Sequence, residues 1–186
     1  MPTTTHTIIS KHKFQYKMTL SIIVAVAKNF AIGRKNELLY HLPTDMKRFK
    51  KTTTGHTVIM GKNTFASFPR RPLPNRRNIV LALPHEVPED RGGAEWVNSL
   101  QQAFDLCKAD EEVFIIGGAY VYHQTLPLAD RLYLTIVDDE PEDADAFFPE
   151  INFEDWEETF REEHTDVEGD DRPFSFVNLQ RRKAEE

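Results

Sequence analysis

The sequence predicts an α/β protein of one domain, built on a mostly parallel central sheet. Three observations lead to this prediction: apolar runs of strand length recur along the chain, patterns typical of helices lie between them, and glycine directly follows two of the runs. Strands that alternate with helices favour a parallel sheet, because each connection must cross over to the same edge. With 40% hydrophobic and 28% charged residues, the 186-residue chain can bury a substantial core.

The first strand and helix organise the whole prediction. Ile22–Ala27 is an uninterrupted apolar run, as expected for a central strand that is buried on both faces. The loop Lys28–Leu42 carries apolar residues, which suggests a lid that closes on a ligand. A helix is expected over Thr44–Thr52, with Thr44 as N-cap and Pro43 opposing an earlier start.

The remaining elements follow in order. Further strands are predicted at Thr57–Met60, Asn78–Leu83, Ala94–Val97, Glu112–Ile116 and Arg131–Val137. Helices are predicted from Lys62 through Phe65, over Leu100–Lys108 after the N-cap Ser99, and over Ala119–Leu126. A hairpin of Trp156–His164 and Phe174–Arg181 is expected around Gly169. Ligands of such sheets bind beyond the carboxyl ends of the strands, so the binding region is expected after Gly61 and at Gly117-Gly118.

Asp45 has two interpretations. An acid in the first turn of a helix complements the helix dipole, which is worth ~0.3–1 kcal/mol. Alternatively, its carboxylate could lie in a pocket beside Met46 and Phe49 and bind a flat, amidine-like N–C–NH2 edge through two parallel hydrogen bonds. The position of Asp45 alone does not decide between them.

Charge and composition exclude several classes of function. A net charge of −7 argues against a nucleic-acid partner, and no apolar run reaches the ~20 residues of a membrane helix. Cys107 is the only cysteine, so no intrachain disulfide and no cysteine zinc site are expected, and a reducing cytoplasm fits. The histidines show no paired metal-ligand spacing. Residues 1–17 are expected to be a disordered extension before a domain at 18–186, with a mitochondrial-type presequence as the alternative.

Six short motifs follow one another along the chain. They are Ile32-Gly33, Leu42-Pro43-Thr44-Asp45, Val58-Ile59-Met60-Gly61, Arg71-Pro72-Leu73-Pro74, Ile116-Gly117-Gly118 and Phe148-Pro149. Each motif is weak by itself, but their order and spacing over Thr19–Arg182 are very specific. Together they resemble the dihydrofolate reductase family, most closely its single-domain bacterial type.

The resemblance implies a three-layer fold, with a mixed, mostly parallel central sheet, flanking helices and a C-terminal hairpin. It implies NADPH-dependent reduction of 7,8-dihydrofolate to 5,6,7,8-tetrahydrofolate, with hydride to pterin C6 and a proton to N5. This reaction supplies one-carbon and thymidylate metabolism, and the family is the target of trimethoprim and methotrexate. A monomeric cytoplasmic enzyme is expected, with dihydrofolate as its small-molecule partner.

The resemblance also implies site residues. Asp45 matches the carboxylate that binds the pterin, Thr135 braces it, Tyr40 belongs to the lid and Tyr122 lies near the nicotinamide. Arg76 matches the arginine that pairs with the glutamate α-carboxylate of the substrate. The other implied substrate-binding residues are Ile23, Met46, Phe49, Phe68, Arg71 and Ile116. The implied cofactor-binding residues are Ala25, Ile32, Gly33, Lys62, Asn63, Thr64, Leu81, Ala82, Gly117, Gly118, Ala119, Tyr120, Val121 and Tyr122.

The chain departs from the family pattern at a few positions. Tyr40 stands where tryptophan is usual, and Lys62 stands where arginine is frequent. Ala82-Leu83 and Tyr120 replace residues that are usually hydroxylic or basic, so Lys62 is expected to carry a modest preference for NADPH over NADH. Two alternatives stay open: a riboflavin-pathway pyrimidine reductase on the same scaffold, which Asp45 and Arg76 argue against, and a non-catalytic nucleotide-binding module.

Overall fold

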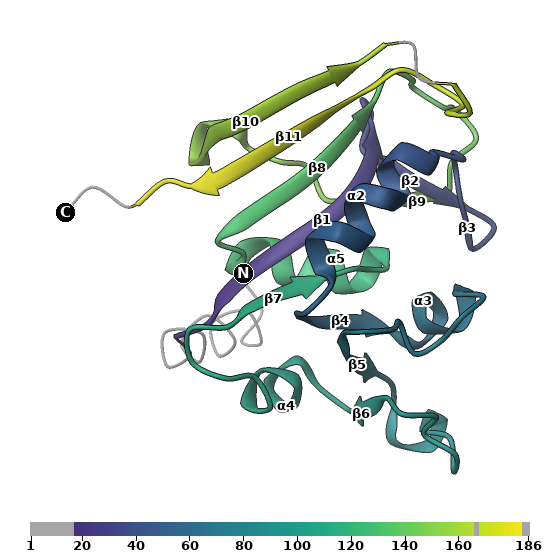
Figure 1. The fold of residues 1–186 in the computed structure, drawn as a ribbon, viewed down its shortest axis with the longest axis vertical. Helices are drawn as coiled ribbons and strands as arrows, with labels where there is room; N and C mark the ends of the chain where they lie inside the picture. Colours follow the sequence, from purple (N-terminus) through teal and green to yellow (C-terminus); the bar gives the residue numbers. More distant parts are fainter. Residues whose placement is uncertain (1–16, 166–167, 184–186) are drawn as a thin grey trace, which may run out of the picture.

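The computed structural model describes residues 17–165 and 168–183, and one eight-stranded sheet runs through them in the order β10-β11-β8-β1-β7-β4-β5-β6 (Figure 1). The strands from β8 to β6 in that order are parallel, whereas β11 is antiparallel to both β8 and β10. The bounds are β1 Thr19–Ala27, β4 Thr57–Gly61, β5 Arg77–Leu81, β6 Glu95–Val97, β7 Glu112–Ile115, β8 Arg131–Val137, β10 Trp156–His164 and β11 Phe174–Arg181. The predicted mixed, mostly parallel sheet with a C-terminal hairpin is confirmed. The predicted extension at residues 1–17 lies outside the described residues, except for Lys17.

Helices cover both faces of the sheet and complete the predicted three layers (Figure 1). The period-two alternation of β1 decides which side chain faces which layer. Leu20 and Ile22 pack with Phe104 and Val121 on one face, whereas Ile23 packs with Phe65 on the other. Burying each such side chain stabilises the folded state by ~1.5–3 kcal/mol relative to leaving it exposed to water. The helices are α2 Pro43–Thr53 and α3 Lys62–Ser67 on one face, and α4 Leu100–Asp105 and α5 Ala119–Thr125 on the other, with 3-10 turns η1 Pro84–Glu86, η2 Leu126–Leu128 and η3 Phe153–Asp155.

The loop predicted at Lys28–Leu42 contains two short strands that the sequence analysis missed. They are β2 Ala31–Arg34 and β3 Glu37–Leu38, and they form a small sheet with β9 Ala146–Phe147. Strands of two to four residues are too short to show an alternating pattern. Gly33 is needed in this sheet, because a Cβ there would come within 3.1 Å of the carbonyl oxygen of Glu37.

The start of α2 corrects the expected N-cap. The helix begins at Pro43, with Leu42 at the N-cap position and no cap from a neighbouring side chain, so the prediction that Thr44 is the N-cap is wrong. Proline suits the first helical position because it lacks the N–H that would be unpaired there. The main-chain N–H and Oγ1 of Thr44 instead donate to the carboxylate of Asp170, at 3.1 and 2.7 Å. The β10–β11 turn therefore caps this helix from 126 positions away.

The proline-rich segment before β5 is held in place by Asn78, which is buried. Its Nδ2 donates to the carbonyl oxygens of Leu73 at 3.0 Å and Arg76 at 2.9 Å, and its Oδ1 accepts from the N–H of Leu73 at 2.8 Å. One side chain thus satisfies three main-chain groups that no strand or helix pairs. The peptide bond between Arg71 and Pro72 is cis.

We predict that Asn78→Ala lowers the free energy of unfolding by roughly 2–4 kcal/mol, because buried main-chain groups lose their partners. Urea unfolding followed by circular dichroism measures this loss. Gln101→Ala removes an exposed amide from α4 and should stay within about 0.5 kcal/mol of the wild type. Equal losses in the two variants would contradict the role of Asn78.

Candidate active site

A cleft of about 1430 Å³ opens along the carboxyl ends of β1, β4, β5 and β7, between α2, α3 and α5. Pockets for one drug-sized ligand occupy roughly 300–1,000 Å³, so this cleft has room for two ligands side by side. Most of the predicted site residues line it. They are Ile23, Ala25, Ile32, Gly33, Asp45, Met46, Phe49, Lys62, Asn63, Thr64, Phe68, Arg76, Leu81, Ala82, Ile116, Gly117, Gly118, Ala119, Tyr120, Val121 and Tyr122.

Three predicted site residues do not line the cleft. Thr135 lies on β8, behind Asp45, and acts on that carboxylate directly. The hydroxyl of Tyr40 donates to Asp139 at 2.8 Å, and its ring packs with the buried cluster around Leu42, away from the cleft wall. Arg71 donates from Nη1 to the carbonyl oxygens of residues 66 and 68, at 3.0 and 3.1 Å, so its guanidinium points at main chain.

The carboxylate of Asp45 is half-buried at the start of α2 and lines the cleft. Thr135 donates from Oγ1 to its Oδ1 at 2.5 Å. Burial raises the pKa of Asp45 above the usual range of a carboxyl group, and the negative charge of Asp170 adds to this shift. The hydrogen bond from Thr135 and the positive charge of Arg48 oppose it. Asp45 is therefore a carboxylate whose charge depends on a few specific neighbours.

Arg48 is one neighbour that the sequence analysis did not single out. Its Nη1 donates to the carbonyl oxygen of Leu134 at 3.2 Å, its Nη2 donates to Asn178, and its guanidinium lies 4.2 Å from the ring centre of Phe176. Burial lowers the pKa of Arg48. Arg48 follows Asp45 by three residues, and this spacing places the two side chains on the same side of α2. The spacing is the feature of the sequence from which their interaction could have been predicted.

Glycines and Tyr122 form the floor of the cleft at the end of β7. The Gly117–Gly118 peptide is cis, and Gly117 has a φ of 115°. A Cβ on Gly117 would lie 3.2 Å from the hydroxyl oxygen of Tyr122. That hydroxyl donates to the carbonyl oxygen of Ile23 at 2.9 Å, and burial raises the pKa of Tyr122, which keeps it neutral. The absence of side chains here lets a ligand lie against the main chain.

Arg76 supplies a cation to the same cleft. Its Nε donates to the carbonyl oxygen of Pro74 at 2.9 Å, and its Nη1 donates to Thr53 Oγ1 at 3.1 Å. Burial lowers its pKa, and its guanidinium makes no ion pair with any residue in the described ranges. A partly buried guanidinium with two fixed hydrogen bonds and no counter-ion suits a carboxylate ligand.

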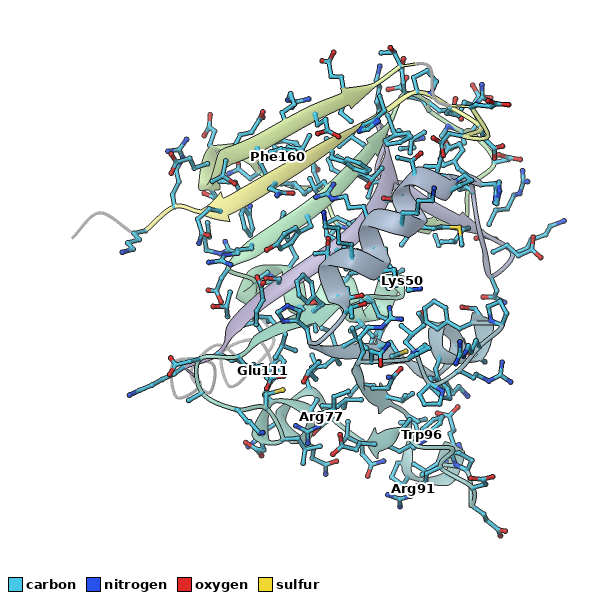
Figure 2. All side chains as sticks on the ribbon, in the orientation of Figure 1. Lys50, Arg77, Arg91, Trp96, Glu111 and Phe160 are labelled. Carbon is cyan, nitrogen blue, oxygen red and sulfur yellow. The ribbon has the colours of Figure 1, made fainter. Side chains whose placement is uncertain are left out.

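The opposite wall of the cleft, beside β5, holds an ion pair that the sequence analysis missed. Lys62 at the start of α3 pairs with Glu86 of η1, and both line the cleft. Glu86 also accepts from the N–H of Leu83 at 3.1 Å. Arg77 does not line this wall: it pairs with Glu95 and lies between α4 and β6, as Figure 2 shows.

Other classes of site find little support in the described part of the chain. There, no three or more His, Cys, Asp or Glu side chains gather in a way that could hold a metal ion. None of the helices over the same residues is long and apolar enough to span a membrane. Burial raises the pKa of the Cys107 thiol to about 12, so this cysteine is a poor nucleophile.

Comparison with known proteins identifies the family. A sequence model described as dihydrofolate reductase matches residues 19–181. The dihydrofolate reductase of Bacillus subtilis (strain 168) is 40% identical over 166 residues, which cover 89% of this chain and 96% of that protein. The Haemophilus influenzae enzyme of the same name is 44% identical over 148 residues, or 78% of this chain and 88% of the relative.

A solved structure agrees with the sequence matches. It is the dihydrofolate reductase of Enterococcus faecalis complexed with NADP(H) and RAB-propyl, with a TM-score of 0.78 and 30% identity, and the match covers 90% of this chain and 99% of that one. These matches favour dihydrofolate reduction over the riboflavin-pathway alternative. Since both the sequence and the fold match over nearly the whole domain, the chain belongs to the dihydrofolate reductase family.

Proposed function

We propose that the cleft binds dihydrofolate between Asp45 and Arg76 and binds NADPH along its glycine floor, for the family reaction of reducing 7,8-dihydrofolate to 5,6,7,8-tetrahydrofolate. The observation that supports this most is one cleft that contains both a braced carboxylate and a guanidinium that has no counter-ion among residues 17–165 and 168–183. Dihydrofolate carries a matching pair of groups, an amidine-like pterin edge and a glutamate carboxylate. The apolar side chains of Phe49 and Phe68 line the same cleft.

At the pterin end, both carboxylate oxygens of Asp45 accept hydrogen bonds from the amidine-like edge. Such a charge-assisted pair fixes the orientation of a planar ring. Thr135 orients the carboxylate from behind, and Arg48 favours its ionised form. The negative charge of Asp45 then favours the protonated form of the pterin. The proposal needs no side chain in contact with N5, so the proton reaches N5 through water. The apolar walls Ile23, Met46 and Ile116 exclude other water from the ring.

The residues at the glycine floor fit NADPH. The cofactor supplies the hydride that the pterin receives at C6. Gly117 and Gly118 leave open the space that side chains would fill, with Thr64 Oγ1 only 3.5 Å from a Cβ built on Gly118. Main-chain N–H groups and the hydroxyl of Thr64 would hold its phosphate groups, and Ala25 and Ile32 would lie at its nicotinamide end, since these residues line the same cleft. We place the 2′-phosphate near Lys62.

Two further proposals concern the whole molecule. We propose that the enzyme is a monomer, as the resemblance to the family's single-domain bacterial type implies. The chain has one cysteine and therefore no intrachain disulfide, which fits a location in the reducing cytoplasm. Tyr40 is assigned to the lid side, where its bond to Asp139 ties the segment before α2 to the loop after β8.

We predict that Asp45→Asn lowers kcat at pH 7 by roughly 10²-fold or more, because the amide keeps the shape and loses the charge. The loss should be smaller at lower pH, where solution protonates more of the substrate. The measurement is the pH dependence of kcat and kcat/KM with NADPH and dihydrofolate. Wild-type turnover in the variant at pH 7 would rule out the role of Asp45.

We predict that the same substitution stabilises the folded protein at pH 7. Because the pKa of Asp45 is raised from its ordinary value of 3.8, the folded state binds its proton more tightly than the unfolded chain does. The stability from this group is therefore present below about pH 3.8 and is lost as pH rises through the folded-state pKa. The Tm of Asp45→Asn should exceed that of the wild type at pH 7, and the difference should shrink toward pH 4. A variant that is less stable at pH 7 than the wild type would contradict the shift.

We predict that Arg76→Lys raises KM for dihydrofolate about 10- to 150-fold and changes kcat little, because a charged, bidentate contact is worth ~1.5–3 kcal/mol. Steady-state kinetics with dihydrofolate and with a dihydropterin that lacks the glutamate separates the two ends of the substrate. The shorter substrate should not be affected by the substitution. Arg71→Lys is the matched control, since Arg71 does not line the cleft. Equal losses on both substrates would exclude a contact between Arg76 and the glutamate.

A further inference from the structure

We infer that Glu86 is a specificity-determining residue that lowers the preference of this enzyme for NADPH and makes NADH a usable cofactor. The inference rests on the proposed placement of the 2′-phosphate near Lys62. Glu86 comes from η1, the short turn after β5, and lines the cleft at that wall. A carboxylate at that wall repels a phosphate group, which weakens its binding, but can accept a hydrogen bond from a hydroxyl group.

The charges at this wall cancel. Its lining residues come from the start of α3, the end of β5 with η1, and the segment from β6 into α4. Among these described residues, the charged side chains are Lys62 and Glu86, one of each sign. The neutral lining residues are Asn63, Thr64, Leu81, Ala82, Leu83, Asn98, Ser99, Leu100 and Gln101. A 2′-phosphate that approaches this wall therefore meets no net positive charge.

The carboxylate of Glu86 is fixed in place. One oxygen accepts from the N–H of Leu83 at 3.1 Å, and the other pairs with Nζ of Lys62. Pro84 at the start of the turn restricts its backbone. The side chain of Glu86 is 20% exposed, against 43% for Lys62, so Lys62 is the more exposed partner of the pair. A ligand at this wall therefore encounters the carboxylate whether or not Lys62 turns toward it.

The two cofactors respond differently to a fixed carboxylate. To bind the 2′-phosphate of NADPH, Lys62 must leave Glu86 or share its charge, and two negative groups then lie close together. The 2′-hydroxyl of NADH can instead donate a hydrogen bond to Glu86 while Lys62 stays paired. Dinucleotide-binding folds that take NAD use an acidic residue on the ribose in this way. Glu86 thus weakens NADPH binding and strengthens NADH binding at the same wall.

The direct test uses Glu86→Gln, because the amide oxygen still accepts from Leu83 while the charge is removed. Isothermal titration calorimetry with adenosine 2′,5′-bisphosphate and adenosine 5′-monophosphate measures binding of each adenosine end without any chemistry. We expect affinity for the bisphosphate to rise roughly tenfold, as for one charge-assisted contact, and affinity for the monophosphate to stay equal or fall. The gain should shrink at high salt, where charges are screened.

Two more variants make the outcome decisive. Glu89→Gln removes the same charge from an exposed position in the same loop and should leave both affinities unchanged. Lys62→Ala should weaken binding of the bisphosphate alone. If Lys62→Ala has no effect, the placement of the 2′-phosphate fails and the inference fails with it. A different result would overturn only the inference about Glu86: Lys62→Ala lowers the affinity for the bisphosphate, but Glu86→Gln, like Glu89→Gln, changes neither affinity. The 2′-phosphate would then still lie near Lys62, and the ion pair between Lys62 and Glu86 would behave as an exposed pair that contributes little.

Discussion

The proposed reaction depends on one carboxylate, Asp45, that must be charged inside a largely apolar cleft, at a cost to the stability of the folded protein. The carboxylate of Asp45 is largely shielded from solvent at the start of α2, and this burial raises its pKa. A buried charge is costly unless nearby groups stabilise it. Thr135 and Arg48 supply that stabilisation from β8 and α2, whereas Asp170 caps α2 and adds an opposing charge. In the folded protein the charge of Asp45 thus depends on a balance among groups from three parts of the chain, which the assembled sheet, helix and hairpin bring together.

The fold brings these groups together through its strand order. The central position of β1 puts β8 on one side and β7 on the other, so Thr135 lies behind the cleft and the glycine pair forms its floor. Since β11 pairs with β8, the β10–β11 turn reaches the start of α2. The other wall follows from β4 and β5, whose carboxyl ends lead to Lys62 and to the turn with Glu86. One cleft is therefore lined both by Asp45 and Arg76, which we propose bind the substrate, and by Lys62 and Glu86, which we propose lie near the 2′-phosphate of the cofactor.

The sequence allowed much of this to be predicted, for identifiable reasons. Uninterrupted apolar runs such as Ile22–Ala27 and the turn residue Gly169 between two strand-like segments are strong local signals, and the observed strands contain or match the predicted ones. The helix expected to end at Lys108 stops at Asp105, and the predicted N-cap Thr44 is inside α2, because tertiary contacts decide helix ends. Arg48, Asp170 and Glu86 were missed for a common reason. Each acts through a partner in three-dimensional space, and a single charged residue in a sequence does not reveal whether it is solvated or paired.

The central claim is that Asp45 is a carboxylate of raised pKa that is ionised when it binds the pterin. The most direct test is carbon-13 NMR of the protein labelled at aspartate carboxyl carbons, with Asp45→Asn used to assign the signal. The account predicts that the pKa of Asp45 lies above its ordinary value of 3.8 and that Asp45 is ionised at pH 7 with bound substrate. Titration in the ordinary range, or a protonated Asp45 in the complex at pH 7, would contradict it.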